Sequence, residues 1–313
     1  MSIEVVSIGE LLVEVMRKKV NEPLGVSGTF IGPFPSGAPA IFIDTVARLG
    51  VKSGFIGTVG EDDFGKLILD RLKEDGVDTR YVRILKNYTT GVAFVTYFSD
   101  GSRKFIFHLP QAASGQIALE QINKNYLSKI RYLHIMGSSL SINAQVQKSC
   151  YEVAKIVKDF QGKITFDPNL RAELLGVNKV REICQPILSS CEIILPSEEE
   201  AKLLTGEKDA ESACEKLLNY GIKVIALKRG RRGSTIFTLK EKIEVPSFKI
   251  KEVDPTGAGD CFDAGFVVGL LKEWPLKKIA TFANAVGALA VTKKGPMEGA
   301  PTIKEVNRLL ERK

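Results

Sequence analysis

Short apolar runs recur along the chain, and longer segments with helical spacing separate them. The runs occupy residues 3–10, 132–136, 163–167, 192–195 and 224–227. A continuous apolar run of this length is typical of a strand that is buried on both faces, as in a parallel sheet. The pattern therefore predicts a core sheet whose strands are mostly parallel.

Helix-like segments lie between these runs, at residues 38–50, 62–76, 143–160 and 197–206. Strands that alternate with helices form right-handed βαβ units around a mostly parallel sheet. In such sheets ligands bind beyond the carboxyl ends of the strands. We therefore expect an α/β fold with its site at that edge.

One region departs from the alternation. Residues 88–109 are typical of two strands around a Ser-Asp-Gly turn, and residues 27–37 of a strand followed by a turn. A small β layer beside an α/β body can cover a site and exclude water from reactive phosphates. We expect a single domain over residues 1–313, with a β lid built from about 11–36 and 88–110.

Composition excludes several classes of protein. The 313 residues are 44% hydrophobic and 26% charged, which suits one large or two modest globular domains. The net charge of +7 comes from dispersed lysines and arginines, so no nucleic-acid partner is expected. The longest apolar run, residues 262–271, is broken by Asp263 and is far shorter than the roughly 20 residues of a membrane helix. Without a signal-peptide pattern, we expect a cytoplasmic protein with no membrane partner.

Cysteines and histidines are few and scattered. The five cysteines include no CxxC pair, and the two histidines are His108 and His134. This distribution argues against a disulfide framework and against a cysteine and histidine metal cluster.

The stretch KEVDPTGAGDCFDAGFVVGLL carries the strongest chemical signal. In it, Gly257, Ala258 and Gly259 directly precede Asp260 and an apolar, helix-like segment. Small residues let another molecule approach the backbone, and a helix that begins there points its free N–H groups and positive dipole end at that molecule. The pattern predicts an anion hole that contains a carboxylate. The alternative is a glycine-rich helix start that only packs tightly.

The same stretch resembles the second signature of the ribokinase-like carbohydrate kinases, the PfkB family, because seven consecutive residues fit D-x-T-G-A-G-D. The segments SIGELLVE, PSGAPA, FDPNLR, LPSEEEAKLLTG and FANAVGALAVTKKG follow the family's order. The resemblance implies a three-layer α/β/α body with a mostly parallel sheet and a small β lid. It also implies a homodimeric kinase that uses ATP and Mg²⁺ to phosphorylate a small sugar.

The resemblance assigns roles at the reacting centre. Asp260 becomes the general base that takes a proton from a sugar hydroxyl, and the N–H groups of residues 257–259 hold the developing negative charge. FDPNLR supplies Asp167, Asn169 and Arg171 for phosphate and substrate contacts. A guanidinium binds two oxygens at once, so Arg171 is the expected ligand of the transferring phosphate. An N-cap and a surface cation are the alternative interpretation.

Two segments resemble the family's nucleotide-binding parts. Ser197 stands where the family usually has Asn, whereas Glu200 keeps an implied water-mediated link to Mg²⁺. The same pair also fits a helix capping box, and both interpretations can hold together.

The loop KRGRRGS resembles the one under the ATP phosphates and ribose, with Lys228, Gly230 and Gly233 at its matched positions. Asn284 falls where the family lines the adenine pocket. Either glycine would also suit a simple hairpin.

The sugar side departs further from the family. Glu14 stands where family members have an acid that binds two sugar hydroxyls. Gly37 would let sugar hydroxyls approach the backbone. Ile41 replaces the Asn that the family pattern has at this position. Asp254 and Thr256 precede the anion hole where some relatives bind a monovalent cation, so potassium is a candidate cofactor.

The expected sugar depends on an arginine that the chain lacks after the lid hairpin. The aromatic-x-Arg element that 2-keto-3-deoxygluconate kinases carry after the lid hairpin is absent. Strand alternation lets at most one of Arg103 and Lys104 point inward, and a neutral sugar needs only hydroxyl partners such as Gln111 or Ser114. We therefore expect a ketohexose, fructose or tagatose. A 2-keto-3-deoxygluconate kinase and a non-catalytic sugar or nucleotide sensor are the alternatives.

Overall fold

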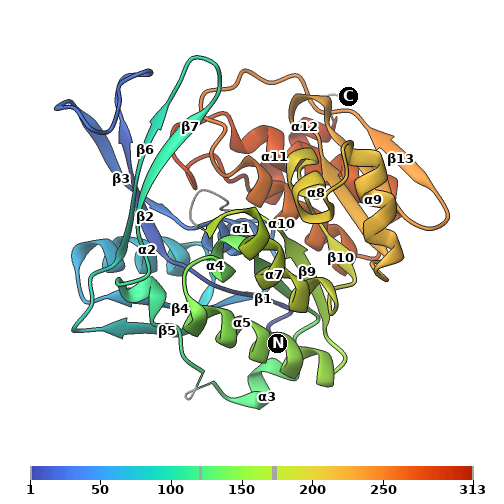
Figure 1. Cartoon of the computed structure of the whole chain (residues 1–313), viewed down its shortest axis with the longest axis horizontal. Helices are drawn as coiled ribbons and strands as arrows, with labels where there is room; N and C mark the ends of the chain where they lie inside the picture. The colour runs from blue at the N-terminus through green and yellow to red at the C-terminus, as the bar shows by residue number, and fades with distance from the viewer. Residues whose placement is uncertain (1, 120–121, 171–174, 312–313) are drawn as a thin grey trace.

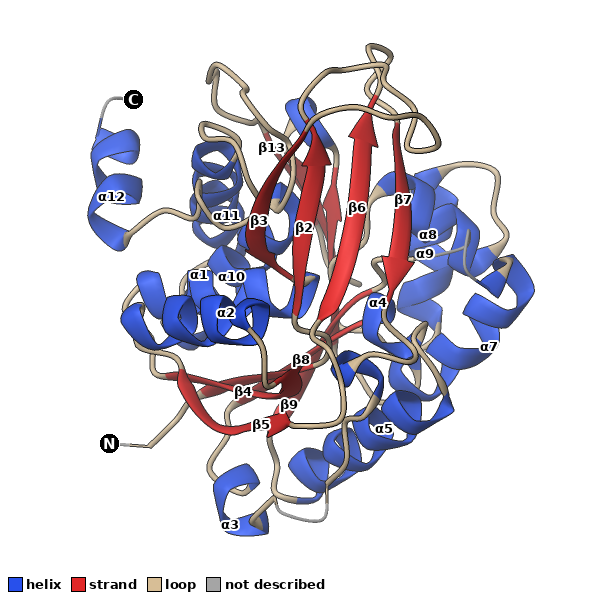
Figure 2. Cartoon of the chain, turned by 90° about the vertical axis from the view of Figure 1, so that its left-hand side faces the viewer, coloured by secondary structure: helices blue, strands red, loops and turns tan. Residues whose placement is uncertain are grey.

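The computed structural model describes residues 2–119, 122–170 and 175–311 (Figure 1). They form a layered α/β body, and a smaller sheet stands on one edge of it (Figure 2). Within these residues no helix is long and apolar enough to cross a membrane.

The main sheet has nine strands in the order β13-β12-β11-β10-β9-β8-β1-β4-β5. All neighbours are parallel except the two pairs that β12 makes. This confirms the predicted, mostly parallel sheet. Its strands are β1 (Val5–Ile8), β4 (Ser53–Gly60), β5 (Asp78–Leu85), β8 (Tyr132–Met136), β9 (Lys163–Asp167), β10 (Ile193–Ile194), β11 (Val224–Lys228), β12 (Ser234–Phe237) and β13 (Lys242–Val245).

Helices cover both faces of this sheet, which gives the expected three layers (Figure 1). Successive side chains of a strand point to opposite faces, and in β1 Val5 and Val6 accordingly belong to different hydrophobic cores. The core of Val5 includes side chains of α1 (Ala38–Arg48), α2 (Asp63–Glu74), α10 (Ala258–Leu271), α11 (Leu276–Ala290) and α12 (Ile303–Glu311). The core of Val6 includes side chains of α3 (Lys124–Leu127), α4 (Gly137–Leu140), α5 (Ala144–Asp159), α7 (Val177–Leu188), α8 (Glu198–Thr205) and α9 (Ala210–Asn219).

The smaller sheet, here called the lid sheet, has the order β3-β2-β6-β7. Its strands are β2 (Leu12–Arg17), β3 (Phe30–Ser36), β6 (Gly91–Tyr97) and β7 (Arg103–His108). β2 and β6 are parallel, and the outer pairs are antiparallel. The first two strands come from the segment between β1 and α1, and the other two follow β5, before the short 3₁₀ turn η1 (Ala113–Gly115).

The carboxyl ends of the central strands position the site. β1, β8, β9 and β11 run in the same direction, and Met136 of β8 lies opposite Asp167 of β9. The loops that follow these strands therefore meet at one edge, and the lid sheet rises from that edge (Figure 2).

Candidate active site

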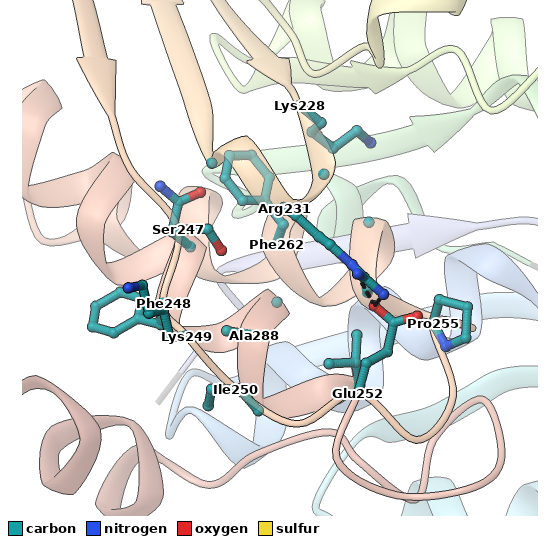
Figure 3. A pocket seen from close by; sticks show the side chains of 17 residues that line it. Lys228, Arg231, Ser247, Phe248, Lys249, Ile250, Glu252, Pro255, Phe262 and Ala288 are labelled. Carbon is teal, nitrogen blue, oxygen red and sulfur yellow. Dashed lines mark hydrogen bonds and ion pairs between the residues drawn. The ribbon is translucent and has the colours of Figure 1, made fainter. Parts of the chain in front are cut away.

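Two cavities meet at the carboxyl edge of the main sheet. The larger has a volume of about 760 Å³, and the described residues that line it all come from the segment 228–291 (Figure 3). The smaller, of about 240 Å³, lies between that edge and the lid sheet. Lys228, Pro255 and Gly259 line both cavities. A group transferred between molecules bound in the two cavities would pass these residues.

Helix α10 begins at this junction. Gly257 is its N-cap with φ 79°, and a Cβ there would lie 2.4 Å from the carbonyl oxygen of Pro296, so only glycine fits. The N–H of Ala258 donates to the Pro255 carbonyl oxygen over 3.3 Å. In the described part of the chain, the N–H groups of Gly257 and Gly259 find no acceptor. Two of the three predicted N–H groups are thus left for an anion.

Asp260 lies in the first turn of α10, lines the smaller cavity and is only 8% exposed. Asn169, with φ 34°, follows β9 and donates through Nδ2 to Oδ1 of Asp260 over 3.3 Å. Its own N–H donates to Oδ1 of Asp167 over 3.1 Å, which fixes the tight turn. Arg171, the predicted phosphate ligand, lies outside the described residues.

Lys228 ends β11, and its ammonium lies 2.9 Å from Oδ2 of Asp167. Burial alone would raise the pKa of Asp167, but the ammonium and hydrogen bonds hold that pKa below its usual value. Asp167 is therefore ionised and paired with a cation at the end of the central strands. The family resemblance implied a place for Lys228 under the nucleotide phosphates; the residue lines both the larger and the smaller cavity.

Ser197 and Glu200 form the capping box that the sequence allowed at the start of α8. Oε2 of Glu200 accepts from the N–H and the hydroxyl of Ser197 over 2.7 and 2.8 Å, and Oε1 accepts from the Leu170 N–H over 3.2 Å. Glu200 thus ties the loop after β9 to the loop after β10. Both residues line the smaller cavity rather than the larger one.

Buried carboxylates form one wall of the smaller cavity. Glu14 of β2 accepts from the Ser36 hydroxyl over 2.6 Å, and Glu10 accepts from the Ser138 hydroxyl over 2.7 Å. Gly37 has φ 113°, and a Cβ there would lie 2.4 Å from the Glu10 carbonyl oxygen. Sequence reasoning missed Glu10, although its place directly after a strand that ends in Gly was a usable signal.

The lid sheet forms the opposite wall. Arg103 and the stacked rings of Phe105 and Phe107 line the cavity from alternate positions of β7, which leaves Lys104 on the other face. Ser114, named in advance as a hydroxyl partner, donates instead to the Leu109 carbonyl oxygen over 3.1 Å. Neither Ser114 nor Gln111 lines the cavity, because the chain turns away from it after Leu109. Ile41 lines the cavity from α1.

Asp254 and Thr256, the candidate monovalent-cation residues, bond to each other. Oδ1 of Asp254 accepts from the N–H and the hydroxyl of Thr256 over 3.0 and 2.7 Å. Oδ2 accepts from the Gly295 N–H over 3.0 Å and lies 3.8 Å from the Lys294 ammonium. Both oxygens of this carboxylate are therefore engaged within the protein.

The larger cavity contains the matched glycines of KRGRRGS and Asn284. Gly230 and Gly233 flank the turn between β11 and β12, and a Cβ on Gly233 would lie 2.1 Å from the Val245 carbonyl oxygen. The Asn284 amide donates to the Val245 and Pro246 carbonyl oxygens over 3.0 and 3.2 Å.

An ion pair lies beside the larger cavity. Arg231 and Glu252, both part of its lining, approach to 3.2 Å (Figure 3). Among the described residues there is no cluster of three or more His, Cys, Asp or Glu side chains able to hold a metal ion. A metal at this site would therefore depend on ligands from a bound nucleotide and water.

Comparisons with known proteins agree with this geometry. The family model described as "pfkB family carbohydrate kinase" matches residues 2–303. Fructokinase-1 of Zea mays is 31% identical, covering 98% of this chain and 98% of its own length. An Escherichia coli protein provisionally called Ribokinase II, solved with ATP and Mg²⁺, is 41% identical with a TM-score of 0.93, and all of both chains is covered.

A fructokinase of Vibrio cholerae, solved with fructose, ADP and calcium, is 25% identical with a TM-score of 0.81, covering 99% of this chain and 100% of its own. A double mutant of it was solved with fructose, ADP and potassium.

Proposed function

Because the chain belongs to the pfkB family of carbohydrate kinases, we propose that this ATP-dependent sugar kinase phosphorylates a hydroxyl of a ketohexose, fructose or tagatose. One observation carries the proposal: Asp260 and the start of α10 lie where a cavity of monosaccharide size meets a larger one. Similarity to plant and bacterial fructokinases supports the ketohexose.

In the proposed reaction, Asp260 accepts the proton of the sugar hydroxyl while the oxygen of that hydroxyl bonds to the γ-phosphorus of ATP. The bond from that phosphorus to the bridging oxygen breaks, and ADP leaves with the electron pair. The N–H groups of Gly257 and Gly259 stabilise the negative charge of the transferring group. Asn169 orients the carboxylate through its 3.3 Å bond. A non-catalytic sensor would need neither the base nor the anion hole.

The nucleotide is assigned to the larger cavity, with Gly230 and Gly233 under the phosphates and ribose and Asn284 beside the base. The space beside Gly230 is open and lets phosphate oxygens approach the backbone, whereas the backbone of Val245 fills the space beside Gly233 and fixes the turn. Ser197 lines the smaller cavity and not the larger one, so we assign it no contact with the nucleotide.

The residues present fit Mg²⁺ through a water molecule and not as direct ligands. A carboxylate oxygen has two lone pairs, and Oε1 of Glu200 uses one for Leu170, so it can also accept from a metal-bound water. Mg²⁺ bound to the ATP phosphates would neutralise their charge and orient the γ-phosphoryl group.

Potassium fits less well. Oδ1 of Asp254 already accepts two hydrogen bonds from Thr256. Oδ2 accepts from Gly295 and lies 3.8 Å from the Lys294 ammonium, whose charge would repel a second cation. We assign potassium no step in the reaction. The homodimer and the cytoplasmic location remain predictions.

A second substrate class has a specific observation in its favour. Arg103 lines the sugar-side cavity and can pair with a carboxylate, which a 2-keto-3-deoxygluconate kinase needs. Against it stand Glu10, Glu14 and Asp260, whose charges would repel an acid.

The deciding experiment measures kcat/KM for fructose, tagatose and 2-keto-3-deoxygluconate with ATP and Mg²⁺. We expect a ketohexose to lead by at least about tenfold, which corresponds to about 1.4 kcal/mol. Preference for the acid would replace the substrate and leave the kinase assignment intact. Failure of all three, with ATP still bound, would point to another sugar or to a sensor.

A further inference from the structure

Beneath the junction of the two cavities lies a buried cluster of one cation and two acids. The Lys228 ammonium is 2.9 Å from Oδ2 of Asp167 and 3.3 and 3.2 Å from the two oxygens of Asp263. Asp263 is 0% exposed and Asp167 2% exposed. The three side chains come from β11, β9 and α10, so the fold assembles the cluster from distant parts of the chain.

The cluster contains one negative charge too many if both acids are ionised. An unpaired charge in a dry interior is costly, and such a site takes up a proton instead. Asp167 lies nearer to the ammonium, at 2.9 Å against 3.2 and 3.3 Å for Asp263, and is therefore the better placed of the two acids to stay ionised. Burial raises the pKa of Asp263 well above its usual value, whereas the pKa of Asp167 is held low. The proton therefore belongs to Asp263.

Neighbouring groups favour the same arrangement. Asp260 lies one turn before Asp263 on α10, and its charge also opposes ionisation of Asp263. Burial lowers the pKa of His134 on β8 to about 3, so this ring adds no positive charge. Glu200 on α8 acts on the Lys228 ammonium and favours its charged form. Lys228 accordingly keeps its proton, because burial is outweighed by the nearby carboxylates.

The ammonium also lies where it can bind an anion. It lines both cavities, and it is 3.6 Å from where a Cβ of Gly259 would be, so the missing side chain leaves it room. An ammonium has three N–H donors. One N–H points to Oδ2 of Asp167, and a second can be shared by the two oxygens of Asp263, which lie at nearly equal distances of 3.3 and 3.2 Å, so the third can point to a phosphate oxygen.

We propose that Asp263 is a positioning residue for phosphoryl transfer: as a neutral acid it holds the Lys228 ammonium at the junction of the cavities without cancelling its charge. The inference rests on the proposed kinase function. It places Lys228 against the transferring phosphoryl group, with Asp167 as the single ionised carboxylate behind it. ATP should then bind more tightly than ADP by a margin that depends on Asp263.

The test compares Asp263→Leu and Asp263→Asn. Leucine has a similar size but no polar atom, so the ammonium should move toward Asp167. We expect the ATP-to-ADP affinity ratio and kcat each to fall at least about tenfold, with KM for the sugar changed less than about threefold. Asparagine can accept from Lys228 and donate to Asp167, so it should restore both values to within about threefold of the wild type. The pH profile of kcat should be the same in the asparagine variant.

Asp44→Leu is the control, because Asp44 is equally buried but pairs with Arg71 of α2 at 3.0 Å and lines neither cavity. It should leave the ATP-to-ADP affinity ratio unchanged. A folded Asp263→Leu variant with the wild-type ratio would overturn the proposal. A tenfold loss of kcat or of the ATP-to-ADP affinity ratio in Asp263→Asn, or a shifted pH profile of its kcat, would also overturn the proposal. The asparagine variant therefore decides the question if the leucine variant does not fold. Absence of ATP binding by the wild type would instead refute the proposed function.

Discussion

The side-chain amide of Asn169 donates to the carboxylate of Asp260 over 3.3 Å and joins the loop after β9 to the first turn of α10. The two residues are far apart in the chain, and each is held by its own local geometry. Asn169 adopts φ 34° in a turn closed by Asp167, and Asp260 follows a glycine N-cap with φ 79°. The orientation of the proposed base thus depends on two elements at once.

Replacing Asp260 by Asn should lower kcat by at least about 100-fold, because the amide keeps the shape but cannot take the proton. Nucleotide affinity should stay within about threefold, since the N–H groups at the start of α10 are unchanged. Steady-state kinetics and ATP titration measure both. Asp44→Asn, at a buried acid outside the cavities, is the control and should keep its turnover. Near-normal kcat in Asp260→Asn would remove this residue as the base.

Glu200→Gln should raise the Mg²⁺ concentration needed for half-maximal rate by about threefold or more, because the proposed partner of this carboxylate is a metal-bound water. The matched control is Glu305→Gln. Glu305 forms the same box with Thr302 before α12, with contacts of 2.7 and 2.8 Å. Gln can keep the bonds to the N-cap residue, so both variants should stay within about 1 kcal/mol of the wild-type free energy of unfolding, measured in urea. Equal Mg²⁺ responses in the two variants would leave Glu200 with a capping role alone.

Much of the fold could be predicted because its strands are continuous apolar runs. β8 and β9 coincide with runs 132–136 and 163–167, since strands buried on both faces are apolar throughout. β4, SGFIGTVG, escaped prediction although it is buried over its whole length. Its glycines are poor strand formers by propensity, and its place between β1 and β5 makes it a strand.

Arg103→Gln should lower kcat/KM for a neutral ketohexose by no more than about tenfold, the cost of one hydrogen bond. For a sugar acid the loss should be larger, because a buried carboxylate would lose its cation. The control is Lys104→Gln, which alters the other face of β7 and should leave both values unchanged. The size of the loss in Arg103→Gln, measured with both sugars, therefore distinguishes the two substrate classes. No effect with either sugar would exclude Arg103 from the site.

His134 should make the protein less stable as the pH falls below about 6.5. Burial lowers its pKa to about 3 in the fold, so between about pH 6.5 and 3 the unfolded chain binds the extra proton and unfolding is favoured. The slope is about 1.4 kcal/mol per pH unit. Urea unfolding at pH 7.5, 6.5 and 5.5 should show a flatter pH dependence in His134→Gln. The exposed His108 provides the control, and His108→Gln should follow the wild type. Parallel curves for all three proteins would contradict this account.

The site itself could be predicted only where a local pattern carried it. The glycines before Asp260 form such a pattern, whereas Glu14 and Gly37 were assigned from the family resemblance. The pairing of Lys228 with Asp167 and Asp263 joins residues up to 96 positions apart, from 167 to 263, and no local spacing reveals it. Arg103 could be limited to one of two faces by strand alternation, but which face meets the cavity depends on how the lid sheet stands on the body.

The lid sheet comes from two insertions in the first 110 residues, whereas every described residue that lines the larger cavity comes after 227. Under the proposed function, the sugar would therefore meet a wall that the nucleotide does not contact. Exchange of residues 12–36 and 91–109 with those of a relative would alter the sugar-facing wall and leave the nucleotide-facing wall untouched. Such modularity gives substrate preference room to diversify while the phosphate donor stays the same.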